Sequence, residues 1–337
     1  MARYAKDQPD GFTNAIESVA IVGAGGTVGS RIVSALVEGG KHTVTALSRK
    51  GSPNKIAPGV QIATIDYDDE TSIVEALRGQ QCLIITLAPA APPNTHSKLV
   101  HAASKAGVPY IVPNNYGGDI DNVKMGQETM LGPVARANRA EIERLGMQWI
   151  TIACGFWYDY SLAGSEWSFG FDFAKRAVTF YDDGSTYGTF STLAQVGRAV
   201  AKVLSLKELP DDEGDKGPTL SSFLGKAVYV QSFRVNQREM LESVKRVTGT
   251  TDADWKVSHV DSKKRYEEGL AQVQSGDRSG FIKLLYARGF YPDDPADFSA
   301  KTQNELLGLP EESLDVGTRA ALAIVQHLQS LAKRTAA

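Results

Sequence analysis

The regular alternation of short apolar runs with amphipathic stretches, which starts at Ser18, limits the folds open to this chain more than any other feature. Strands are predicted at residues 19–22, 43–47, 61–65, 83–87, 108–112, 149–153 and 227–230, and helices at 27–38, 71–77, 95–105, 134–145 and 193–204. Strands that are apolar along their whole length belong to parallel sheets that helices cover on both faces. The predicted fold class is therefore α/β, with a doubly wound parallel sheet of the Rossmann type.

The character of the sequence changes after Cys154, which indicates a second domain. Residues 156–190 are rich in aromatic residues, glycine and serine, and the chain beyond residue 236 is mainly helical and polar. We expect a nucleotide-binding domain of residues 15–155 and 191–233. A smaller α/β substrate domain of residues 156–190 and 234–330 is then interleaved with the end of the sheet. Residues 1–14 and 331–337 are expected to be tails, and the polar stretch 209–218 a surface loop.

Composition and charge argue against several classes of partner. The net charge is −3, with 42% hydrophobic and 22% charged residues, and no basic block favours nucleic acid. Residues 1–10 lack the apolar core of a signal peptide, and the apolar run 82–91 is too short to cross a bilayer. Cys82 and Cys154 lie in apolar strands, as buried thiols of a reducing compartment do. We therefore expect a cytoplasmic protein that binds neither nucleic acid nor a membrane.

A glycine-rich loop directly follows the first predicted strand and opens the first helix. Its glycines Gly23, Gly26 and Gly29 have the spacing G-x-x-G-x-x-G. Backbone N–H groups at the start of a helix bind a pyrophosphate, provided that side chains do not block its approach. The loop is therefore predicted to bind a dinucleotide. Its predicted contacts are Gly23, Gly25, Gly26, Thr27, Val28 and Gly29.

The end of the second strand distinguishes between the two nicotinamide cofactors. An NAD site has a carboxylate there for the ribose hydroxyls, whereas this chain has Ser48, Arg49 and Lys50. A guanidinium and an ammonium group would pair with the 2′-phosphate of NADP(H), although both could also be ordinary solvated surface charges. NADP(H) is therefore the predicted cofactor. Further predicted contacts at the ends of the third and fourth strands are Asp66, Tyr67, Leu87, Ala88 and Pro89.

These features together resemble the NmrA-like and isoflavone-reductase-like group of atypical short-chain dehydrogenases/reductases. The motifs that carry the resemblance are the glycine loop, Arg49 and the segments 66–69, 106–117, 155–160, 180–184 and 193–201. The resemblance implies a Rossmann domain with a small substrate domain. It also implies that residues 113–116 flank the nicotinamide, with Pro113 and Asn114 as cofactor contacts. It also implies reduction of phenolic or other aromatic small molecules with NADPH, whereas other members are NADP sensors without turnover.

The chain departs from this family at the position of the general acid. Enzymes of the isoflavone-reductase branch have a lysine at the start of the helix before the sixth strand, but residues 133–139 contain none. A Tyr-x-x-x-Lys pair is also missing, since Ile120 follows Tyr116 by four residues. The candidate catalytic residues are therefore Tyr116, Tyr158, Asn115 and Arg139, with Arg136 as an alternative to Arg139. Each tyrosine could instead be a packing residue, and an arginine can stabilise an oxyanion but not donate a proton.

An aromatic stretch follows the last predicted strand of the first domain and supplies the candidate substrate residues. Phe156, Trp157 and Tyr160 could line a flat apolar pocket, or could belong to the core between the domains. No metal site is predicted, because His96 and His101 are five residues apart and do not share a helix face.

The favoured hypothesis is an NADPH-dependent reductase of a small aromatic or polyketide-like carbonyl or enone compound. A non-catalytic NADP(H)-sensing regulator and a redox-neutral isomerase or cyclase are the alternatives. The expected partner is a small aromatic molecule, and the sequence is also compatible with a homodimer.

Overall fold

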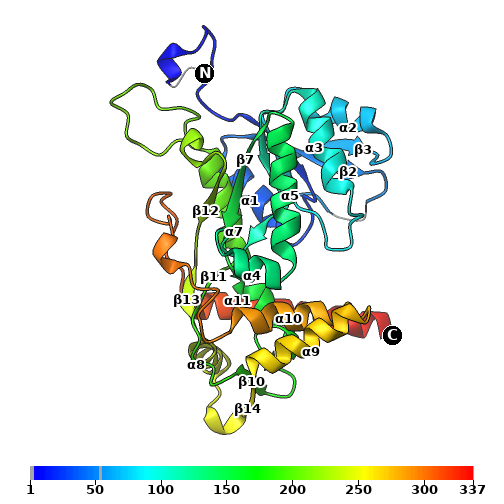
Figure 1. Cartoon of the computed structure of the whole chain (residues 1–337), viewed down its shortest axis with the longest axis vertical. Coiled ribbons are helices and arrows are strands. Elements are labelled where there is room, and N and C mark those ends of the chain that lie inside the picture. Colours follow the sequence, from blue (N-terminus) through cyan, green and yellow to red (C-terminus); the bar gives the residue numbers. More distant parts are fainter. Residues whose placement is uncertain (1–3, 53–54, 337) are drawn as a thin grey trace.

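A seven-stranded parallel sheet forms the centre of the first domain in the computed structural model, which describes residues 4–52 and 55–336 (Figure 1). Its strand order is β3-β2-β1-β4-β5-β7-β12, and the short strand β6 also pairs with β7. The strands are β1 (Ser18–Val22), β2 (Thr43–Arg49), β3 (Gln61–Ile65), β4 (Cys82–Ile85), β5 (Tyr110–Val112), β6 (Tyr116–Gly117), β7 (Gln148–Ala153) and β12 (Lys226–Tyr229). The order reverses between β1 and β4, which confirms the predicted doubly wound α/β fold.

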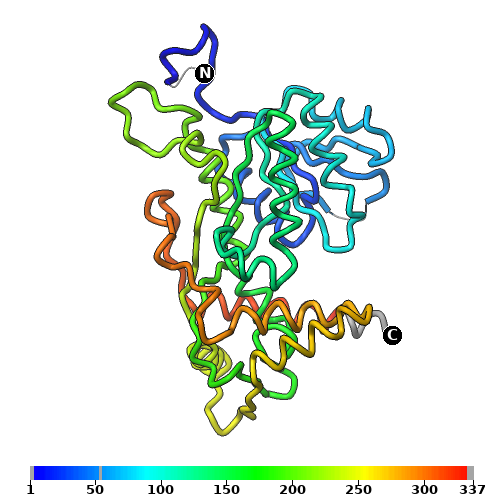
Figure 2. Tube along the Cα trace, viewed as in Figure 1, coloured from blue at the N-terminus to red at the C-terminus, as the bar shows by residue number. Residues whose placement is uncertain are grey.

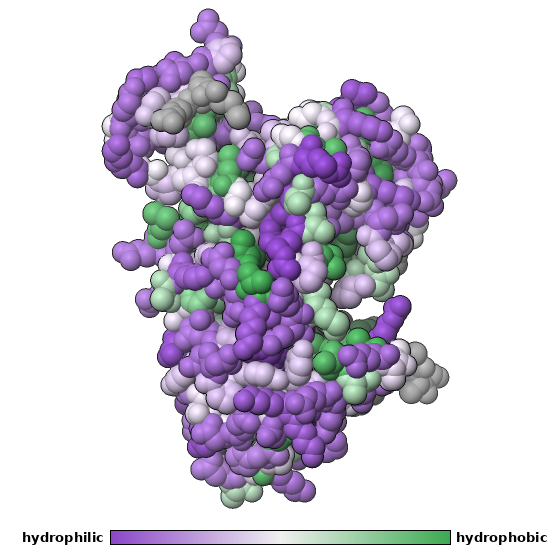
Figure 3. Space-filling model, in the orientation of Figure 1, coloured by the Kyte–Doolittle hydropathy of each residue, from purple (hydrophilic) through white to green (hydrophobic). Residues whose placement is uncertain are grey.

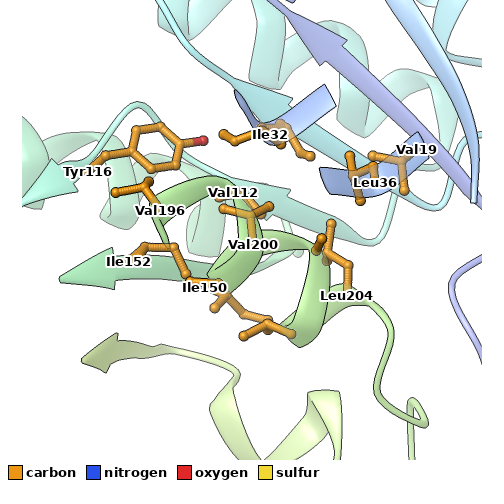
Figure 4. Packing of buried hydrophobic residues seen from close by; sticks show 14 of the residues in the cluster. Val19, Ile32, Leu36, Val112, Tyr116, Ile150, Ile152, Val196, Val200 and Leu204 are labelled. Carbon is orange, nitrogen blue, oxygen red and sulfur yellow. The ribbon is translucent and has the colours of Figure 1, made fainter. Parts of the chain in front are cut away.

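Helices cover both faces of this sheet. The helices α1 (Gly29–Gly39) and α7 (Leu193–Leu204) pack on one face, and α2 (Glu70–Leu77), α3 (Thr95–Ala106) and α5 (Leu131–Arg144) pack on the other. Strand β7 presents apolar side chains on both faces of the sheet. Ile150 and Ile152 face α7 (Figure 4), whereas Trp149 belongs to the core on the opposite face. Both faces are buried, as the apolar strands predicted.

The first domain's helices α1 and α7 cross in very close contact. A Cβ atom at Gly197 in α7 would lie 2.3 Å from the carbonyl oxygen of Arg31 in α1. Only glycine therefore allows the two helices to approach this closely, and their buried residues, among them Ile32, Leu36, Val196 and Val200, fill the space beneath them (Figure 4).

The smaller C-terminal lobe combines two three-stranded sheets with helices. One sheet contains β8 (Phe156–Trp157), β11 (Gly188–Ser191) and β13 (Phe233–Val235), and the other β9 (Phe171–Asp172), β10 (Ala177–Tyr181) and β14 (Lys256–Val260). Its helices are α6 (Tyr158–Ala163), α8 (Gln237–Thr248), α9 (Ser262–Gln274), α10 (Gly280–Gly289) and α11 (Leu314–Ala336). A mainly aromatic core, distinct from the cores of the first domain, holds this lobe together.

Two segments contact the first domain in ways that the sequence did not predict. Residues 302–309, within the range predicted for the substrate domain, run along the exposed edge of β12, where the backbone N–H of Gln303 donates to the carbonyl oxygen of Tyr229. Their Leu307 and Leu309 are buried in the core under α1 and α7. The N-terminal residues pair with the loop that was predicted at 209–218, since the N–H of Ala5 donates to the carbonyl oxygen of Pro210 (Figure 2).

Several element boundaries differ from the prediction. The helix expected from residue 27 begins at Gly29, and that expected from 134 begins at Leu131. The strands expected at 83–87 and 108–112 are shorter, with bounds Cys82–Ile85 and Tyr110–Val112. No helix in the described part of the chain is long and apolar enough to cross a bilayer.

The contact between α1 and α7 gives a test of this packing. We expect Gly197→Ala to lower the free energy of unfolding by about 2 kcal/mol, because the added methyl group overpacks the crossing. Urea denaturation measures this change. The control is Gly39→Ala at the end of α1, where a Cβ atom meets nothing within 4 Å. This control should be neutral or stabilising by up to about 1 kcal/mol, and equal losses in both variants would contradict the packing argument.

Candidate cofactor site

The glycine loop packs so tightly against the end of β4 that side chains are excluded at two of its positions. Gly23 has a φ of +79°, and a Cβ atom there would lie 2.0 Å from the carbonyl oxygen of Thr86. A Cβ atom at Gly29 would lie 2.1 Å from the carbonyl oxygen of Gly23. Gly26 closes the turn, since its N–H donates to the Gly23 oxygen over 2.8 Å. The three glycines of the motif therefore shape one narrow turn.

Thr86 is part of this loop's support, which the sequence analysis missed. Its hydroxyl donates to the carbonyl oxygen of Val22 over 2.8 Å, and its N–H donates to the same oxygen over 3.1 Å. These bonds fix the end of β1 against β4 directly beside the loop. The sequence signal for this role was a polar residue, Thr86, at the end of an otherwise apolar strand.

The start of α1 leaves backbone donors available to a ligand. The N-cap residue Val28 provides no capping side chain, and the N–H groups of Thr27 and Val28 find no acceptor among the described residues. Because the helix dipole adds partial positive charge there, this end of α1 suits a phosphate group. The glycines of the predicted pyrophosphate loop thus leave room for a ligand beside N–H groups that have no acceptor among the described residues. This arrangement fits a dinucleotide.

The predicted 2′-phosphate residues lie at the end of β2 and are exposed. Arg49 is the last residue of β2, and neither Arg49 nor Lys50 forms an ion pair with another residue that the structure describes. Ser48 precedes them and is half-buried. Tyr67 lies near Arg49: burial raises the pKa of its hydroxyl, and the guanidinium partly offsets this effect. An unpaired guanidinium at this edge is available to bind an anion.

Asp66 begins a turn that leads into α2. Its Oδ1 accepts the N–H of Asp68 over 2.9 Å, and Asp69 then caps the helix by accepting the N–H of Thr71 over 3.1 Å. The carboxylate of Asp66 thus stabilises the turn. The turn lies at the carboxyl edge of the sheet beside β2.

The segment predicted to flank the nicotinamide is tied to the end of β4. The side chain of Asn114 bonds both backbone groups of Leu87, accepting its N–H over 3.0 Å and donating to its oxygen over 3.3 Å. Asn115 is half-buried, and its carbonyl oxygen accepts the hydroxyl of Thr151 over 2.6 Å. Pro113 is buried, while Ala88 and Pro89 are exposed beside it. The predicted nicotinamide residues therefore form one connected rim across β4, β5 and β7.

The structure does not support Tyr116 as a proton donor at this rim. Its side chain belongs to the core under α1 and α7, and its hydroxyl points toward Ile32 without a hydrogen-bond partner (Figure 4). Burial raises the pKa of this hydroxyl well above its usual range. The register explains the orientation, because Tyr116 pairs with Ile152, whose side chain faces the same core.

Tyr158 and Arg139 also lie away from the predicted site. Tyr158 is fully buried in the aromatic core of the second lobe, where its hydroxyl bonds that of Thr318 over 2.9 Å. The guanidinium of Arg139 stacks on Trp149 near the start of β7, with its Nη1 buried and without a partner. Burial is the main cause that lowers the pKa of Arg139. These placements fit packing roles, so the predicted catalytic roles are not supported.

The predicted substrate residues divide between core and surface. Phe156 stacks on Tyr286 with ring centroids 4.4 Å apart. It therefore packs against the core of the second lobe, which was one of the two roles that the sequence left open. Trp157 is half-buried against the first domain, and Tyr160 is 47% exposed and contacts its ring edge-on at 5.8 Å. Only Trp157 and Tyr160 of the three are thus placed to meet a ligand.

Asp159, between these aromatic residues, is a buried carboxylate that the sequence analysis did not single out. Its Oδ1 accepts the N–H of Leu193 at the start of α7 over 3.1 Å and that of Tyr160 over 3.0 Å. Burial raises its pKa, and the two backbone bonds partly offset this effect. The residue joins the start of α7 to α6 at the lobe boundary. A lone charged residue in an aromatic stretch was the available signal.

A notch separates the two lobes in the space-filling view, and hydrophobic side chains gather on its lower wall near α10 and α11 (Figure 3). The exposed large apolar residues that the structure describes on these helices are Ile282, Val316, Leu328 and Leu331. An apolar wall opposite the carboxyl edge of the sheet suits a ligand with an apolar body.

His96, on the first turn of α3, is buried with both ring nitrogens unpartnered. Burial lowers its pKa to about 4, although Glu141 opposes the shift. The imidazole is therefore neutral in the folded protein at neutral pH.

Comparison with known proteins confirms the resemblance predicted from the motifs. Residues 16–162 match the model of the NmrA-like family. The oxidoreductase aprR of Aspergillus flavus is 28% identical over 308 residues, which cover 88% of this chain and 96% of that protein. A solved structure of AtPrR2 with NADP+ and (+)pinoresinol is 19% identical with a TM-score of 0.69, covering 91% of this chain and 99% of its own. A structure of isoflavone reductase is 20% identical with a TM-score of 0.68, covering 90% and 99%. These two structures share the fold.

The tight loop gives a binding test. We expect Gly29→Ala to weaken NADPH binding about 100-fold, because the added carbon displaces the turn and costs two charge-assisted bonds from N–H groups to phosphate. Fluorescence titration measures the affinity, and circular dichroism checks that the fold persists. Gly39→Ala on the same helix is the control and should bind normally. Unchanged binding by Gly29→Ala would refute the assignment of the loop.

Buried His96 predicts a pH-dependent stability. Its folded pKa of about 4 lies below the unfolded value near 6.5, so its contribution is complete above pH 6.5 and is lost as the pH falls through 4. We expect this residue to account for about 3 kcal/mol of the stability lost between pH 7 and pH 4. Urea denaturation of His96→Leu should show a flatter pH dependence, whereas His327→Leu, at an exposed position of α11, should match the wild type.

Proposed function

With residues 16–162 belonging to the NmrA-like family, we propose that the chain is an NADPH-dependent reductase of a small aromatic or polyketide-like carbonyl or enone compound. The relative aprR is named an oxidoreductase, and the related AtPrR2 structure contains NADP+ and the aromatic compound pinoresinol. The proposal carries both the cofactor and the aromatic substrate class over to this chain.

The glycine cradle together with Arg49 is the observation that carries the proposal. A Cβ atom would fill the space at Gly23 or Gly29, and the N–H groups of Thr27 and Val28 are free of acceptors within the described residues. Arg49 is exposed at the end of the adjacent strand and forms no ion pair with another residue that the structure describes. A ligand with a pyrophosphate and a 2′-phosphate satisfies both features.

The chain's own residues would then bind and orient the reactants. The start of α1 holds the pyrophosphate, Arg49 and Lys50 pair with the 2′-phosphate, and Asn114 keeps the nicotinamide rim rigid through Leu87. Trp157 and Tyr160 offer aromatic surface to the substrate, and Asn115, which is half-buried in the rim, would orient a carbonyl group. When bound, NADPH supplies the hydride.

The proton for the reduced product would come from water. Reduction consumes one NADPH, one acceptor and one proton, and yields NADP+ and the reduced compound. Tyr116 and Tyr158 are buried in separate cores, so neither hydroxyl reaches the rim. Tyr160, two residues after Tyr158, is exposed, so its hydroxyl group remains available to a bound substrate.

The buried tyrosines also favour a second candidate function. A protein that binds NADP(H) and reports its redox state to a partner needs the cradle and Arg49 but no proton donor. Single-turnover absorbance at the NADPH band separates the two functions. Oxidation of bound NADPH by an aromatic ketone, enone or quinone supports the reductase, whereas tight binding without oxidation by any of them supports the sensor.

Cofactor preference tests the role of Arg49. We expect Arg49→Ala to weaken NADPH binding by about 10- to 100-fold while NADH binding changes by less than about 3-fold, because only NADPH carries the 2′-phosphate. Fluorescence titration with both nucleotides measures this difference. Arg78→Ala, which removes a surface arginine paired with Glu75 on α2, is the control. An equal loss of both nucleotides in Arg49→Ala would contradict the assignment.

A further inference from the structure

Residues 119–128 connect β6 to α5 but are held by the C-terminal lobe. Up to Gly117 the chain is fixed to the sheet, where the Gly117 oxygen accepts the N–H groups of Cys154 over 2.8 Å and Gly155 over 3.0 Å. From Leu131 onward, α5 packs on α3 and β7. Between these points lies the short helix α4 (Val123–Glu128).

Lys301 makes the first of the contacts that hold this segment. Its ammonium group bonds the carboxylates of Asp119 over 2.7 Å and Asp121 over 3.0 Å, and it lies 5.1 Å from the ring centroid of Tyr229. The Tyr229 hydroxyl lies 2.7 Å from Asp119 and 3.0 Å from Asp121. The bonds from Lys301, and then from Tyr229, hold the pKa of Asp121 below its usual range. Lys301 therefore reduces the repulsion between two adjacent carboxylates.

Three further contacts reach α4 from the same lobe. The Asn122 side chain donates to the carbonyl oxygen of Pro295 over 3.1 Å. Arg288, which is 1% exposed, pairs with Glu128. The hydroxyl of Tyr266 donates to the Glu128 carbonyl oxygen over 3.0 Å.

The ends of the segment have backbones suited to a change of direction. At Gly117 and Gly118 a Cβ atom would meet nothing within 4 Å, so the chain is loosely packed there. At the other end Met130 is left-handed with a φ of 60°, which is uncommon for a residue other than glycine. The segment is thus held by residues of the C-terminal lobe over its length, and Tyr229 of β12 in the first domain also bonds Asp119 and Asp121.

We propose that Lys301 is a positioning residue, which holds residues 117–122 and, through them, the nicotinamide-flanking residues 113–116. The inference rests on the proposed function for the role of residues 113–116. Asn114 and Asn115 lie within five residues of Asp119, so a displaced loop moves the rim on which the hydride acceptor must be aligned. The 2′-phosphate end of the cofactor is at β2, three strands away, and is not affected by Lys301.

The test separates alignment from cofactor affinity. Lys301→Met should lower kcat about 10-fold or more, since small displacements of reacting groups reduce rates strongly. Its Kd for NADPH should change by less than about 3-fold, the reverse of Arg49→Ala. Lys301→Arg keeps the charge between the carboxylates and should restore kcat to within about 3-fold of the wild type. Glu128→Gln, which weakens the ion pair between Glu128 and Arg288, should also lower kcat.

Lys283→Met is the matched control, because Lys283 pairs with Glu268 within the C-terminal lobe, and no hydrogen bond or ion pair among the described residues joins its side chain to residues 119–128. It should leave kcat unchanged. A Lys301→Met enzyme with kcat within 2-fold of the wild type would overturn the proposal. So would a loss of kcat that follows the melting temperature and that Lys301→Arg fails to restore.

Hydrogen exchange distinguishes failure of this proposal from failure of the proposed function. If the wild type oxidises no NADPH, NADP+ should still protect the amides of residues 113–122 in the wild type. Lys301→Met should lose that protection while the amides of 24–33 keep theirs. Equal protection of residues 113–122 in both proteins would refute the positioning role, whatever the activity.

Discussion

The contact between the glycine loop and Thr86 is the constraint on which the rest of the candidate site depends. Gly23 must have a positive φ and no side chain, because the backbone of Thr86 occupies the space where a Cβ atom would lie. Thr86 is itself fixed by two bonds to Val22. β1 and β4 are therefore locked together at their carboxyl ends, at the point where the strand order reverses. The N–H groups of Thr27 and Val28, which find no acceptor among the described residues, lie just before α1 at this point.

The two lobes are joined by more than the chain connections between them. Residues 302–309 cover the edge strand β12 and place Leu307 and Leu309 in the core of the first domain. Residues 119–128 extend in the other direction, from the first domain to α10 and Lys301. Each lobe therefore holds a segment of the other. Such mutual attachment accounts for a buried Arg288 pair, which would be costly if it served only local stability.

The sequence predicted the first domain well because its signals are local. Apolar strands, the glycine spacing and helix-ending glycines such as Gly107 each specify structure within a few residues. The helix α1 was predicted to begin two residues too early because the glycine turn extends through Val28. Residues 302–309 could not be predicted, since their contacts with β12 depend on side chains such as Gln303 and on tertiary packing alone. Thr86 was missed for the same reason, since its role depends on a neighbouring strand.

For the catalytic candidates, the position in the sequence does not predict which way the side chain faces. Tyr116 follows β5 at the carboxyl edge, so its place along the chain fits a site residue. Its side chain nevertheless faces the core, because β6 pairs with β7 in the register that sets Tyr116 opposite Ile152. A shift of one residue would set Gly117 there and turn the tyrosine to the other face of the sheet. The choice between a packing residue and a proton donor therefore depends on a two-residue strand, whose pairing neither periodicity nor a family motif specifies.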